Sequence, residues 1–454
     1  MQLTALLQRH EGKTLEFKRD LSSPANVLKT LVAFANSAGG ILVIGVEDRT
    51  RNVKGVAAAL DVQERLANVV ATGITPPLMP AIEVWPWRDM EVIVVEVFPS
   101  STPPHHVNVE GVKRGTYVRV GASNRLADEA LREELKRTAR NESYDELPVP
   151  AMSSEAIDFR AASELFAPVR KLRREDLESL RLLTRHQSRL VPTNAGILLF
   201  GVQRAAAFPD AWVQVGRFSG TTRTHILDTD EIHDYPAVAI SKTVEFVQKH
   251  ALRSFRIEGI RREEHWSIPL PAVREAVINA ITHSDYSQRG APIRVAVFDD
   301  RVEVESPGLL PFGLTVDDIQ AGVSRLRNRV IGRVFKELGL IEQWGSGIGR
   351  MIDACRTHGL PRPEFLEVGT HFRVVFRLLG QSPPAVDPVE TRILQAIEDG
   401  SGLSTRQVAE LVGLSPRSAR TRLKSLVDRG LIVEIGSSPT DPKRLYYLRS
   451  GEHR

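Results

Sequence analysis

A glutamate and an asparagine four residues apart are the first candidates for chemistry in this sequence. Glu275 and Asn279 belong to the segment PAVREAVINAITHSDY, which we expect to be helical, and their spacing places both side chains on one helix face. A carboxylate can activate or orient a water, while an amide oxygen can complete the octahedral shell of a Mg²⁺ ion held mainly by nucleotide phosphates. The ordinary alternative is a pair of solvent-facing side chains.

Three glycines follow in the segment GSGIGR at residues 345–350. The backbones of Gly345, Gly347 and Gly349 could approach phosphates because no side chain would clash. A glycine cluster also commonly ends a helix, and this alternative stays open. The two signals are weak when taken one at a time.

Charged and apolar residues alternate near the start of the chain, in HEGKTLEFKRDL at residues 10–21. Glu16 and Lys18 share one face of an expected strand, and Gly12 allows Glu11 to turn back. Acidic side chains there could hold a divalent cation that activates water, while Lys18 would offset phosphate charge. Acidic residues at strand ends also commonly cap turns or pair with Arg and Lys, so both interpretations remain.

The C-terminal segment has the pattern of a winged helix. VETRILQAIEDG, STRQVAELVG and SPRSARTRLKSLVDRG predict three helices, the last two capped by Ser404 and Ser415, and LIVEI and RLYYL predict a two-stranded wing. The third helix and the wing tip are basic, which favours contact with phosphates and base edges of duplex DNA. The predicted DNA-binding residues are Arg417, Arg420, Arg422, Lys424, Lys443 and Arg444. A winged helix used for protein contacts is the alternative.

The composition is that of an ordinary globular protein with several domains. Its 454 residues suggest about three domains, and 42% of them are hydrophobic and 26% charged. A net charge of +4 is only mildly basic, so nucleic-acid binding must depend on where the cations cluster. Cys355 is the only cysteine, which excludes an intrachain disulfide and a Cys-based zinc cluster. The apolar runs are far shorter than the about 20 residues of a membrane helix, and the first residues lack a secretory signal, so we expect a cytoplasmic protein without a membrane partner.

The candidate residues must be positioned by three successive segments. Residues 1–145 alternate helix and strand, with VLKTLVAFANS as a buried helix and ILVIGV and EVIVVEVF as strands, which predicts an α+β domain. Residues 146–379 also mix helices with a sheet, and GILLFG at 196–201 is expected to be a strand. Pro, Gly and Ser concentrate at 380–388, which is typical of a linker, and residues 389–454 hold the winged helix.

The linked motifs of the middle segment carry a family resemblance. PTNAGILLFG, PAVREAVINAITHSDY, VEVESPGLLP, LRNRVIG and LGLIEQWGSGIGRM closely resemble the bacterial RecG-helicase-related transcriptional regulators. That family combines a Schlafen/Alba-like (AlbA_2) DNA-binding domain, a divergent GHKL-type (HATPase_c_4) ATP-binding domain and often a winged helix. The resemblance covers most of the chain and implies an α+β multidomain protein with a GHKL-like α/β sandwich in its middle.

The resemblance also implies a site for ATP or ADP with Mg²⁺. Glu275 and Asn279 match its N-box, in which the glutamate would serve a weak ATPase activity and the asparagine would hold the metal. The other residues that the resemblance places at the nucleotide are His283, Asp285, Gly308, Gly345, Gly347 and Gly349.

One box departs from ordinary GHKL enzymes. Their Asp-x-Gly-x-Gly box, whose Asp binds the adenine amino group, is represented here by Glu305, Ser306, Pro307 and Gly308. The departure leaves the recognition of adenine open. The chain also lacks a GxxxxGK[ST] loop and a pair of helicase-sized motor domains, which excludes helicase activity.

The start of the chain belongs to the same comparison. EGKTLEFK and TLVAFANSAGGILVIGVED look like the Schlafen/Alba-like module almost in full. Some Schlafen proteins are RNA nucleases in which two glutamates and an aspartate hold a metal, and Glu11, Glu16 and Asp48 occupy the matching places. The resemblance thus implies a Mg²⁺ or Mn²⁺ site with Lys18 beside it, although most relatives of this bacterial architecture are described only as nucleic-acid binders.

The combined interpretation is an ATP-responsive transcriptional regulator that binds duplex DNA through its winged helix. One alternative is a metal-dependent nuclease that acts on RNA or single-stranded DNA under control of the rear domains. Another is an ATPase-driven assembly protein without sequence-specific binding. Because winged-helix proteins often read paired half-sites, we expect a two-fold homo-oligomer.

Overall fold

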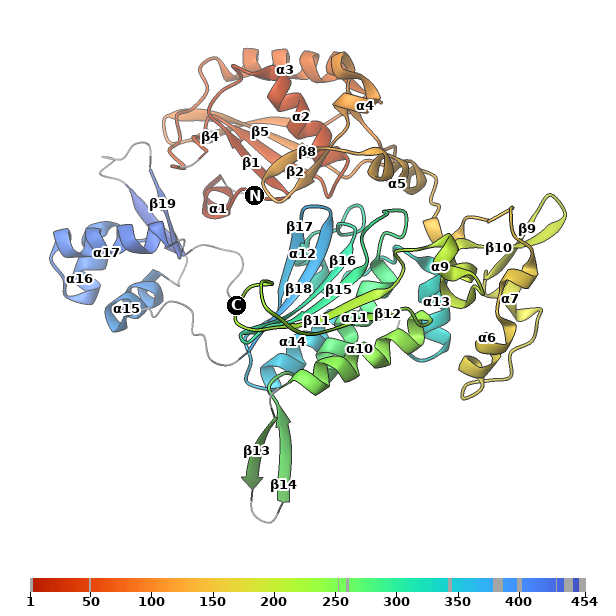
Figure 1. Cartoon of the computed structure of the whole chain (residues 1–454). Coiled ribbons are helices and arrows are strands. Elements are labelled where there is room, and N and C mark those ends of the chain that lie inside the picture. Colours follow the sequence, from red (N-terminus) through yellow and green to blue (C-terminus); the bar gives the residue numbers. More distant parts are fainter. Residues whose placement is uncertain are drawn as a thin grey trace. The chain divides into compact units, whose positions relative to one another are not determined.

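The computed structural model describes residues 3–48, 50–251, 253–258, 261–341, 345–378, 387–397, 402–429, 431–436 and 444–448. Contacts divide the chain into two compact units (Figure 1). One unit comprises Met1–Leu135 with Pro383–Arg454, and the other comprises Lys136–Ser382. Both units mix helices and sheets, which confirms the predicted α+β multidomain class.

A four-stranded sheet organises the N-terminal part of the first unit. Its order is β1-β2-β5-β4, with β1 and β2 parallel and the remaining pairs antiparallel. The strands are β1 (Leu15–Lys18), β2 (Gly40–Ile44), β4 (Ala81–Trp87) and β5 (Met90–Val97). The buried helix α2 (Pro24–Ala35) begins with a proline, whose fixed φ suits the first helical turn, and packs on this sheet.

The remaining elements of this part are short. They are α1 (Leu3–Gln8), α3 (Ala59–Gly73), β3 (Ile74–Thr75), β6 (His106–Val107), η1 (Asn108–Glu110), α4 (Gly111–Gly115), β7 (Tyr117–Val120), β8 (Ser123–Leu126) and α5 (Glu129–Ala139), of which α5 belongs partly to the second unit. The hairpin β7–β8 contacts α2 and thereby brings its polar side chains toward the start of β1.

A six-stranded sheet forms the second unit, in the order β12-β11-β15-β16-β18-β17. Its strands are β11 (Val213–Phe218), β12 (Ile226–Ile232), β15 (Ile293–Val297), β16 (Arg301–Pro307), β17 (Glu364–Val368) and β18 (His371–Arg377). Helices α10 (Pro236–His250), α11 (Leu270–His283) and α14 (Gly347–Thr357) lie along one face of this sheet (Figure 1). Apolar side chains of the sheet and the helices make one continuous core between the two layers.

Shorter elements precede and connect these layers. They are η2 (Tyr144–Glu146), η3 (Ser154–Ala156), α6 (Phe159–Phe166), α7 (Asp176–Ser179), β9 (Leu183–His186), β10 (Arg189–Pro192), α8 (Asn194–Phe200), α9 (Arg204–Ala207), β13 (Arg253–Glu258), β14 (Arg261–Trp266), α12 (Val316–Gln320) and α13 (Arg329–Glu337).

The expected strand at 196–201 is wrong, because residues 196–200 belong to helix α8 and Gly201 is its C-cap. The Thr193 hydroxyl accepts a hydrogen bond from Gly196 N (3.1 Å) and caps the helix. Every residue of α8 is buried, so its sequence shows no amphipathic period that could separate a short helix from a strand.

The C-terminal residues form the predicted three helices and two-stranded wing. They are α15 (Pro388–Ile397), α16 (Thr405–Val412), α17 (Pro416–Asp428), β19 (Ile432–Ile435) and β20 (Leu445–Leu448). Ser404 and Ser415 cap α16 and α17 as expected, and Gly413 takes the left-handed conformation (φ +70°) that ends α16. In the part of the chain that the structure describes, no helix has the length and apolarity to cross a bilayer.

Candidate functional site

A cavity in the second unit gathers most of the residues that were predicted to bind a nucleotide. It lies against α11, α14 and β16 and encloses about 1060 Å³, part of which is open to solvent. Its polar side chains are those of Glu275, Asn279, Thr282, His283, Ser306, Ser324, Arg325 and Arg350, and Gly308, Gly345 and Gly347 also line it. Its apolar lining includes Val304, Leu309, Leu314, Ile319, Met351, Phe372 and Val374. We call this cavity the nucleotide pocket, after the ligand that the sequence predicts for it. An apolar slot with a few convergent polar groups is the usual form of a small-molecule site.

The N-terminus of α14 meets the predicted N-box residues in this pocket. A Cβ atom at Gly347 would lie 2.2 Å from Glu275 Oε1 and 3.5 Å from Asn279 Nδ2, so only glycine allows this approach. Arg350 Nη2 donates a hydrogen bond to Glu275 Oε2 at 3.1 Å. Arg350 was not predicted as a site residue, although it is the last residue of GSGIGR and lies one helical turn after Gly347.

The other glycines of the predicted set have different roles. Gly345 (φ +66°) lines the nucleotide pocket and lies so close to Gly322 O that a Cβ atom would stand 2.4 Å from it. Gly308 (φ +104°) lines the pocket beside Arg327. Gly349 is exposed on α14 with open space around it and is not part of the pocket lining.

Strand alternation decides which residue of the ESPG box faces the nucleotide pocket. Val304 and Ser306 line the pocket, while Glu305 points to the opposite face of the sheet. There Glu305 accepts a hydrogen bond from Arg373 Nε at 2.8 Å, and it is 5% exposed. The carboxylate of Glu305 therefore cannot take the place of the aspartate that binds adenine in ordinary GHKL enzymes.

His283 and Asp285 are separated by the end of α11. His283 lines the nucleotide pocket, and burial lowers the pKa of its imidazole to about 4, with a smaller contribution from the Arg327 charge. Its Nδ1 atom is buried without a hydrogen-bond partner among the described residues. The imidazole is therefore neutral at neutral pH.

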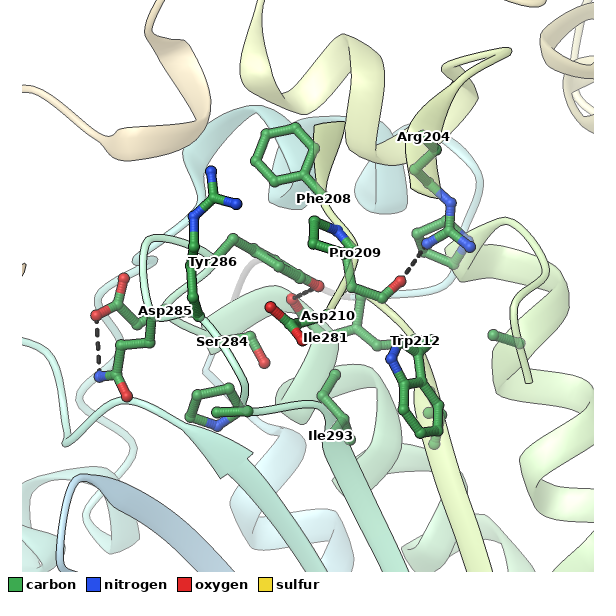
Figure 2. Close-up of a pocket in the computed structure, with 18 of the residues that line it drawn as sticks. Arg204, Phe208, Pro209, Asp210, Trp212, Ile281, Ser284, Asp285, Tyr286 and Ile293 are labelled. Atoms are coloured by element: carbon green, nitrogen blue, oxygen red, sulfur yellow. Dashed lines mark hydrogen bonds between the residues drawn. The ribbon is translucent and has the colours of Figure 1, made fainter. Parts of the chain in front are cut away.

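Asp285 lines a second cavity instead, together with Ser284, Tyr286 and Trp212 (Figure 2). Its carboxylate accepts hydrogen bonds from Ser287 Oγ (2.6 Å) and Gln288 Nε2 (3.1 Å), which close the turn that follows α11. The expectation that Asp285 shapes the nucleotide pocket is corrected by this placement, because the chain turns away at Ser284 after the last residue of the helix.

The three acids predicted near the start of the chain do approach one another. Burial raises the pKa of Glu11 to about 7, and a hydrogen bond with Asp48 and the charges of Glu16 and Asp48 raise it as well. Phe17 N donates to Glu11 Oε1 at 2.6 Å and opposes this rise. The Glu11 carboxyl therefore takes up a proton at a higher pH than an ordinary glutamate does.

Two cationic side chains pair with Glu16, the third acid of this cluster. The Lys18 ammonium donates to Glu16 Oε1, and the Arg119 guanidinium donates to Glu16 Oε2. Arg119 is 1% exposed and also donates to Gly12 O (2.9 Å) and Asn124 Oδ1 (2.8 Å). Arg119 was not predicted as part of this cluster, and its only signal in the sequence is a cation within the apolar strand YVRV.

This arrangement does not fit a divalent cation. Both carboxylate oxygens of Glu16 are already paired, and one oxygen of Glu11 accepts a backbone N–H. Among the residues that the structure describes, no group of three or more His, Cys, Asp or Glu side chains could hold a metal ion. The hydrogen bonds of Arg119 instead join the β7–β8 hairpin to β1, so the acidic cluster is better explained as a structural link between these elements.

The basic residues of the winged helix divide into two groups. Arg417, Arg420 and Lys424 are exposed on α17, and within the described residues none of them has an ion-pair partner. Arg422 is paired with Asp387 just before α15, and Arg444 is paired with Glu434 on β19. These pairs engage the guanidinium groups of Arg422 and Arg444, whose DNA contacts stay predictions, while Lys443 lies outside the described residues.

Three family models match the chain in the expected order. Residues 11–128 match the model "Schlafen, AlbA_2", residues 290–376 match "Putative ATP-dependent DNA helicase recG C-terminal" (HATPase_c_4), and residues 386–433 match "Winged helix-turn-helix DNA-binding". These matches confirm the resemblance that the motifs indicated, and they support nucleic-acid binding. The second match begins after Glu275 and Asn279 and does not include them.

Two solved structures are similar to this chain. The DIP2311 protein from Corynebacterium diphtheriae is 20% identical, with 96% of this chain and 92% of that chain covered and a TM-score of 0.44. The N-terminal domain of a RecG-related protein from Nitrosomonas europaea is 25% identical, with 28% of this chain and 96% of that chain covered and a TM-score of 0.24. No curated protein matches the chain.

Proposed function

We propose that this protein is a cytoplasmic transcriptional regulator that binds duplex DNA through α17 and responds to an adenine nucleotide bound in its middle domain. The observation that carries the DNA part is the exposed basic face of α17, formed by Arg417, Arg420 and Lys424. Their spacing of three and four residues puts the three cations on one helix face. This face spans roughly 10 Å at the 1.5 Å rise of a helix, a length that suits the major groove.

The opposite face of α17 supports this proposal. Ala419, Leu423 and Leu426 are buried in the core of the winged helix, so the helix is held with its basic face outward. Arginines can donate two hydrogen bonds to a guanine edge, whereas a lysine acts mainly on phosphates. We therefore assign sequence readout to Arg417 and Arg420 and phosphate contact to Lys424.

The nucleotide part of the proposal is supported by the content of the nucleotide pocket. Glu275 and Asn279 stand beside the N-terminus of α14, where the helix dipole and unpaired N–H groups favour phosphate. The side-chain oxygen of Asn279 would help to hold Mg²⁺, which would neutralise phosphate charge. Glu275 would orient the attacking water if the bound nucleotide is hydrolysed.

Removal of the winged helix tests the DNA part. The full chain and a chain that lacks residues 385–454 would be titrated into fluorescently labelled duplex DNA selected from a random pool by the full chain. We expect the truncated chain to lose sequence-specific binding. Unchanged specific binding after truncation would transfer the DNA site to the N-terminal domain.

Calorimetry tests the nucleotide part. ATP, ADP and a non-hydrolysable ATP analogue would be titrated with Mg²⁺ into the intact protein, its Asn279→Ala variant and its Glu275→Ala variant. We expect Asn279→Ala to weaken Mg²⁺-dependent binding and Glu275→Ala to affect turnover more than affinity. Absence of both binding heat and a thermal shift in the parent protein would remove the nucleotide from this proposal.

A metal-dependent nuclease is the second candidate, favoured by the meeting of Glu11, Glu16 and Asp48 at one place. The pairing of Glu16 with Lys18 and Arg119 opposes it, because a metal would have to displace one of these cations. Structured RNA, single-stranded DNA and duplex DNA would be incubated with the protein in Mg²⁺ or Mn²⁺. Cleavage that disappears in Glu16→Gln while binding persists would make the nuclease the primary function.

A further inference from the structure

An ion pair inside the nucleotide pocket joins the predicted water-orienting carboxylate to the glycine-rich helix. Arg350 Nη2 and Glu275 Oε2 are 3.1 Å apart, and the two side chains are 40% and 10% exposed. Glu275 belongs to α11 and Arg350 to the first turns of α14, two helices that pack against each other. Both residues line the nucleotide pocket.

The carboxylate of Glu275 lies at a place that also attracts phosphate. Its Oε1 atom is close to Gly347, the first residue of the 11-residue helix α14. Backbone N–H groups and the helix dipole favour an anion at such a terminus. In this structure the Glu275 carboxylate lies beside this terminus and accepts a hydrogen bond from Arg350.

The Glu275 carboxylate and an incoming phosphate would compete for the guanidinium of Arg350. An Arg side chain presents five N–H donors in a planar fork that matches a phosphate better than a single ammonium does. A phosphate group with about two negative charges attracts this fork more strongly than one carboxylate does. Arrival of a phosphate next to Glu275 therefore favours transfer of Arg350 to the phosphate.

The phosphate in question is the terminal one of a nucleoside triphosphate. If Glu275 orients the attacking water, as in the proposed function, its carboxylate must stand near the phosphorus that is attacked. Arg350, in direct contact with that carboxylate, stands near the same phosphate. A diphosphate lacks this group and leaves the ion pair in place.

We propose that Arg350 distinguishes a nucleoside triphosphate from a diphosphate by exchanging Glu275 for the terminal phosphate. Through this exchange Arg350 binds the terminal phosphate, and the Glu275 carboxylate becomes available to orient the attacking water. This inference rests on the proposed nucleotide binding and assigns the discrimination between the two nucleotides to one side chain.

Equilibrium binding of two nucleotides to the intact protein tests the inference. A non-hydrolysable ATP analogue and ADP, each with Mg²⁺, would be titrated into the parent protein and into Arg350→Gln, Arg350→Lys and Arg356→Gln. Arg356 is a matched control on the same helix, because it is exposed and paired with Asp353 away from the pocket.

We expect Arg350→Gln to weaken binding of the triphosphate analogue roughly 10- to 100-fold, the usual effect of losing a charge-assisted hydrogen bond, with little change for ADP. Arg350→Lys keeps the charge without the fork and should recover part of the loss. Arg356→Gln should match the parent for both nucleotides. Thermal unfolding of each variant would verify that the domain is folded.

The Glu275→Gln variant provides a second readout that a purely structural role would not change. Removal of the competing carboxylate should tighten triphosphate binding, and this gain should vanish when Arg350→Gln is added. Equal losses for both nucleotides in Arg350→Gln, or no loss for either, would overturn the inference while the proposed nucleotide binding stands. A parent protein that binds neither nucleotide would overturn the proposed function and this inference together.

Discussion

Glu305 and Ser306 are neighbours on β16, yet their side chains lie on opposite faces of the six-stranded sheet. Ser306 lines the nucleotide pocket, whereas Glu305 pairs across the strands with Arg373 of β18. The two residues that could replace the adenine-binding aspartate of GHKL proteins therefore differ in access to a ligand. A hydroxyl, which can donate or accept, is the group that this box presents to the pocket.

Substitution of Glu305 should affect the sheet and leave nucleotide selection unchanged. Glu305→Ala removes the hydrogen-bonded partner of Arg373, a loss of about 1.5–3 kcal/mol for a hydrogen bond to a charged group. We expect faster amide hydrogen exchange in β16 and β18, measured by mass spectrometry. The ratio of ATP to GTP affinity should equal that of the parent, and a changed ratio would contradict the assignment of Glu305 to the far face.

Two glycines of α14 should respond oppositely to alanine. Gly347→Ala would place a Cβ atom 2.2 Å from Glu275 Oε1, so we expect lower thermal stability and displaced Glu275 and Asn279 side chains. Gly349→Ala meets open space inside a helix and should stabilise α14 by about 0.5–1 kcal/mol. Hydrogen exchange in α14 and nucleotide titration would compare the pair. Similar behaviour of both variants would show that Gly347 is not in close contact with Glu275.

Arginines on the same helix should differ in their effect on DNA binding. Arg417→Ala and Arg420→Ala should each weaken binding to a selected duplex by about 1–3 kcal/mol and relax its sequence preference. Lys424→Ala should weaken binding to all sequences and reduce the salt dependence by about one charge. Arg422→Ala serves as the control, because Arg422 is paired with Asp387. Fluorescence anisotropy at several salt concentrations measures these effects, and a loss confined to Arg422→Ala would reverse the assignment of the two faces.

Removal of Arg119 should destabilise the N-terminal sheet far more than removal of Lys18. Arg119 is 1% exposed, so Arg119→Ala would leave the Glu16 carboxylate buried with one cation, at a cost of about 3–5 kcal/mol. Lys18 is 33% exposed, and we expect Lys18→Ala to cost about 1 kcal/mol or less. Hydrogen exchange of β1 amides separates the two outcomes. Equal protection in both variants would mean that Arg119 does not hold the carboxylate.

The middle domain should lose stability as the pH falls through the titration of His283. The folded pKa of about 4 lies below the ordinary value of 6.5, so between these values the unfolded chain binds a proton that the folded chain excludes. The contribution of the neutral imidazole to the free energy of unfolding is therefore complete above pH 6.5 and is lost progressively as the pH falls toward 4. Amide hydrogen exchange at the C-terminal end of α11 would be measured from pH 7.5 to 4 in the parent and in His283→Gln. The difference between the two proteins isolates the titration of His283. Parallel pH curves for the two proteins would contradict a buried neutral imidazole.

The sequence by itself determined the local elements and the type of each domain. Caps at Ser404 and Ser415 and the amphipathic pattern of the C-terminal helices predict a winged helix, because these signals act within a few residues of the chain. The alternation in VEVES also implies that the side chains of Glu305 and Ser306 point to opposite faces of the sheet, although only the structure shows which face borders the nucleotide pocket. Where burial surrounds an element on all sides, as in α8, the local period disappears and the expected strand was wrong.

Only the tertiary structure decided which charges meet. Arg119 reaches Glu16 across 103 residues of sequence, Arg350 reaches Glu275 across 75, and Arg422 turns to Asp387 across 35. The periodicity of a sequence predicts which face of a helix or strand a side chain occupies. The partner of that side chain belongs to another element, and only the packing of the two elements decides which residue it is. The acids of the N-terminal cluster and the cations of α17 could be found from sequence, whereas their pairing depended on how other elements pack against them.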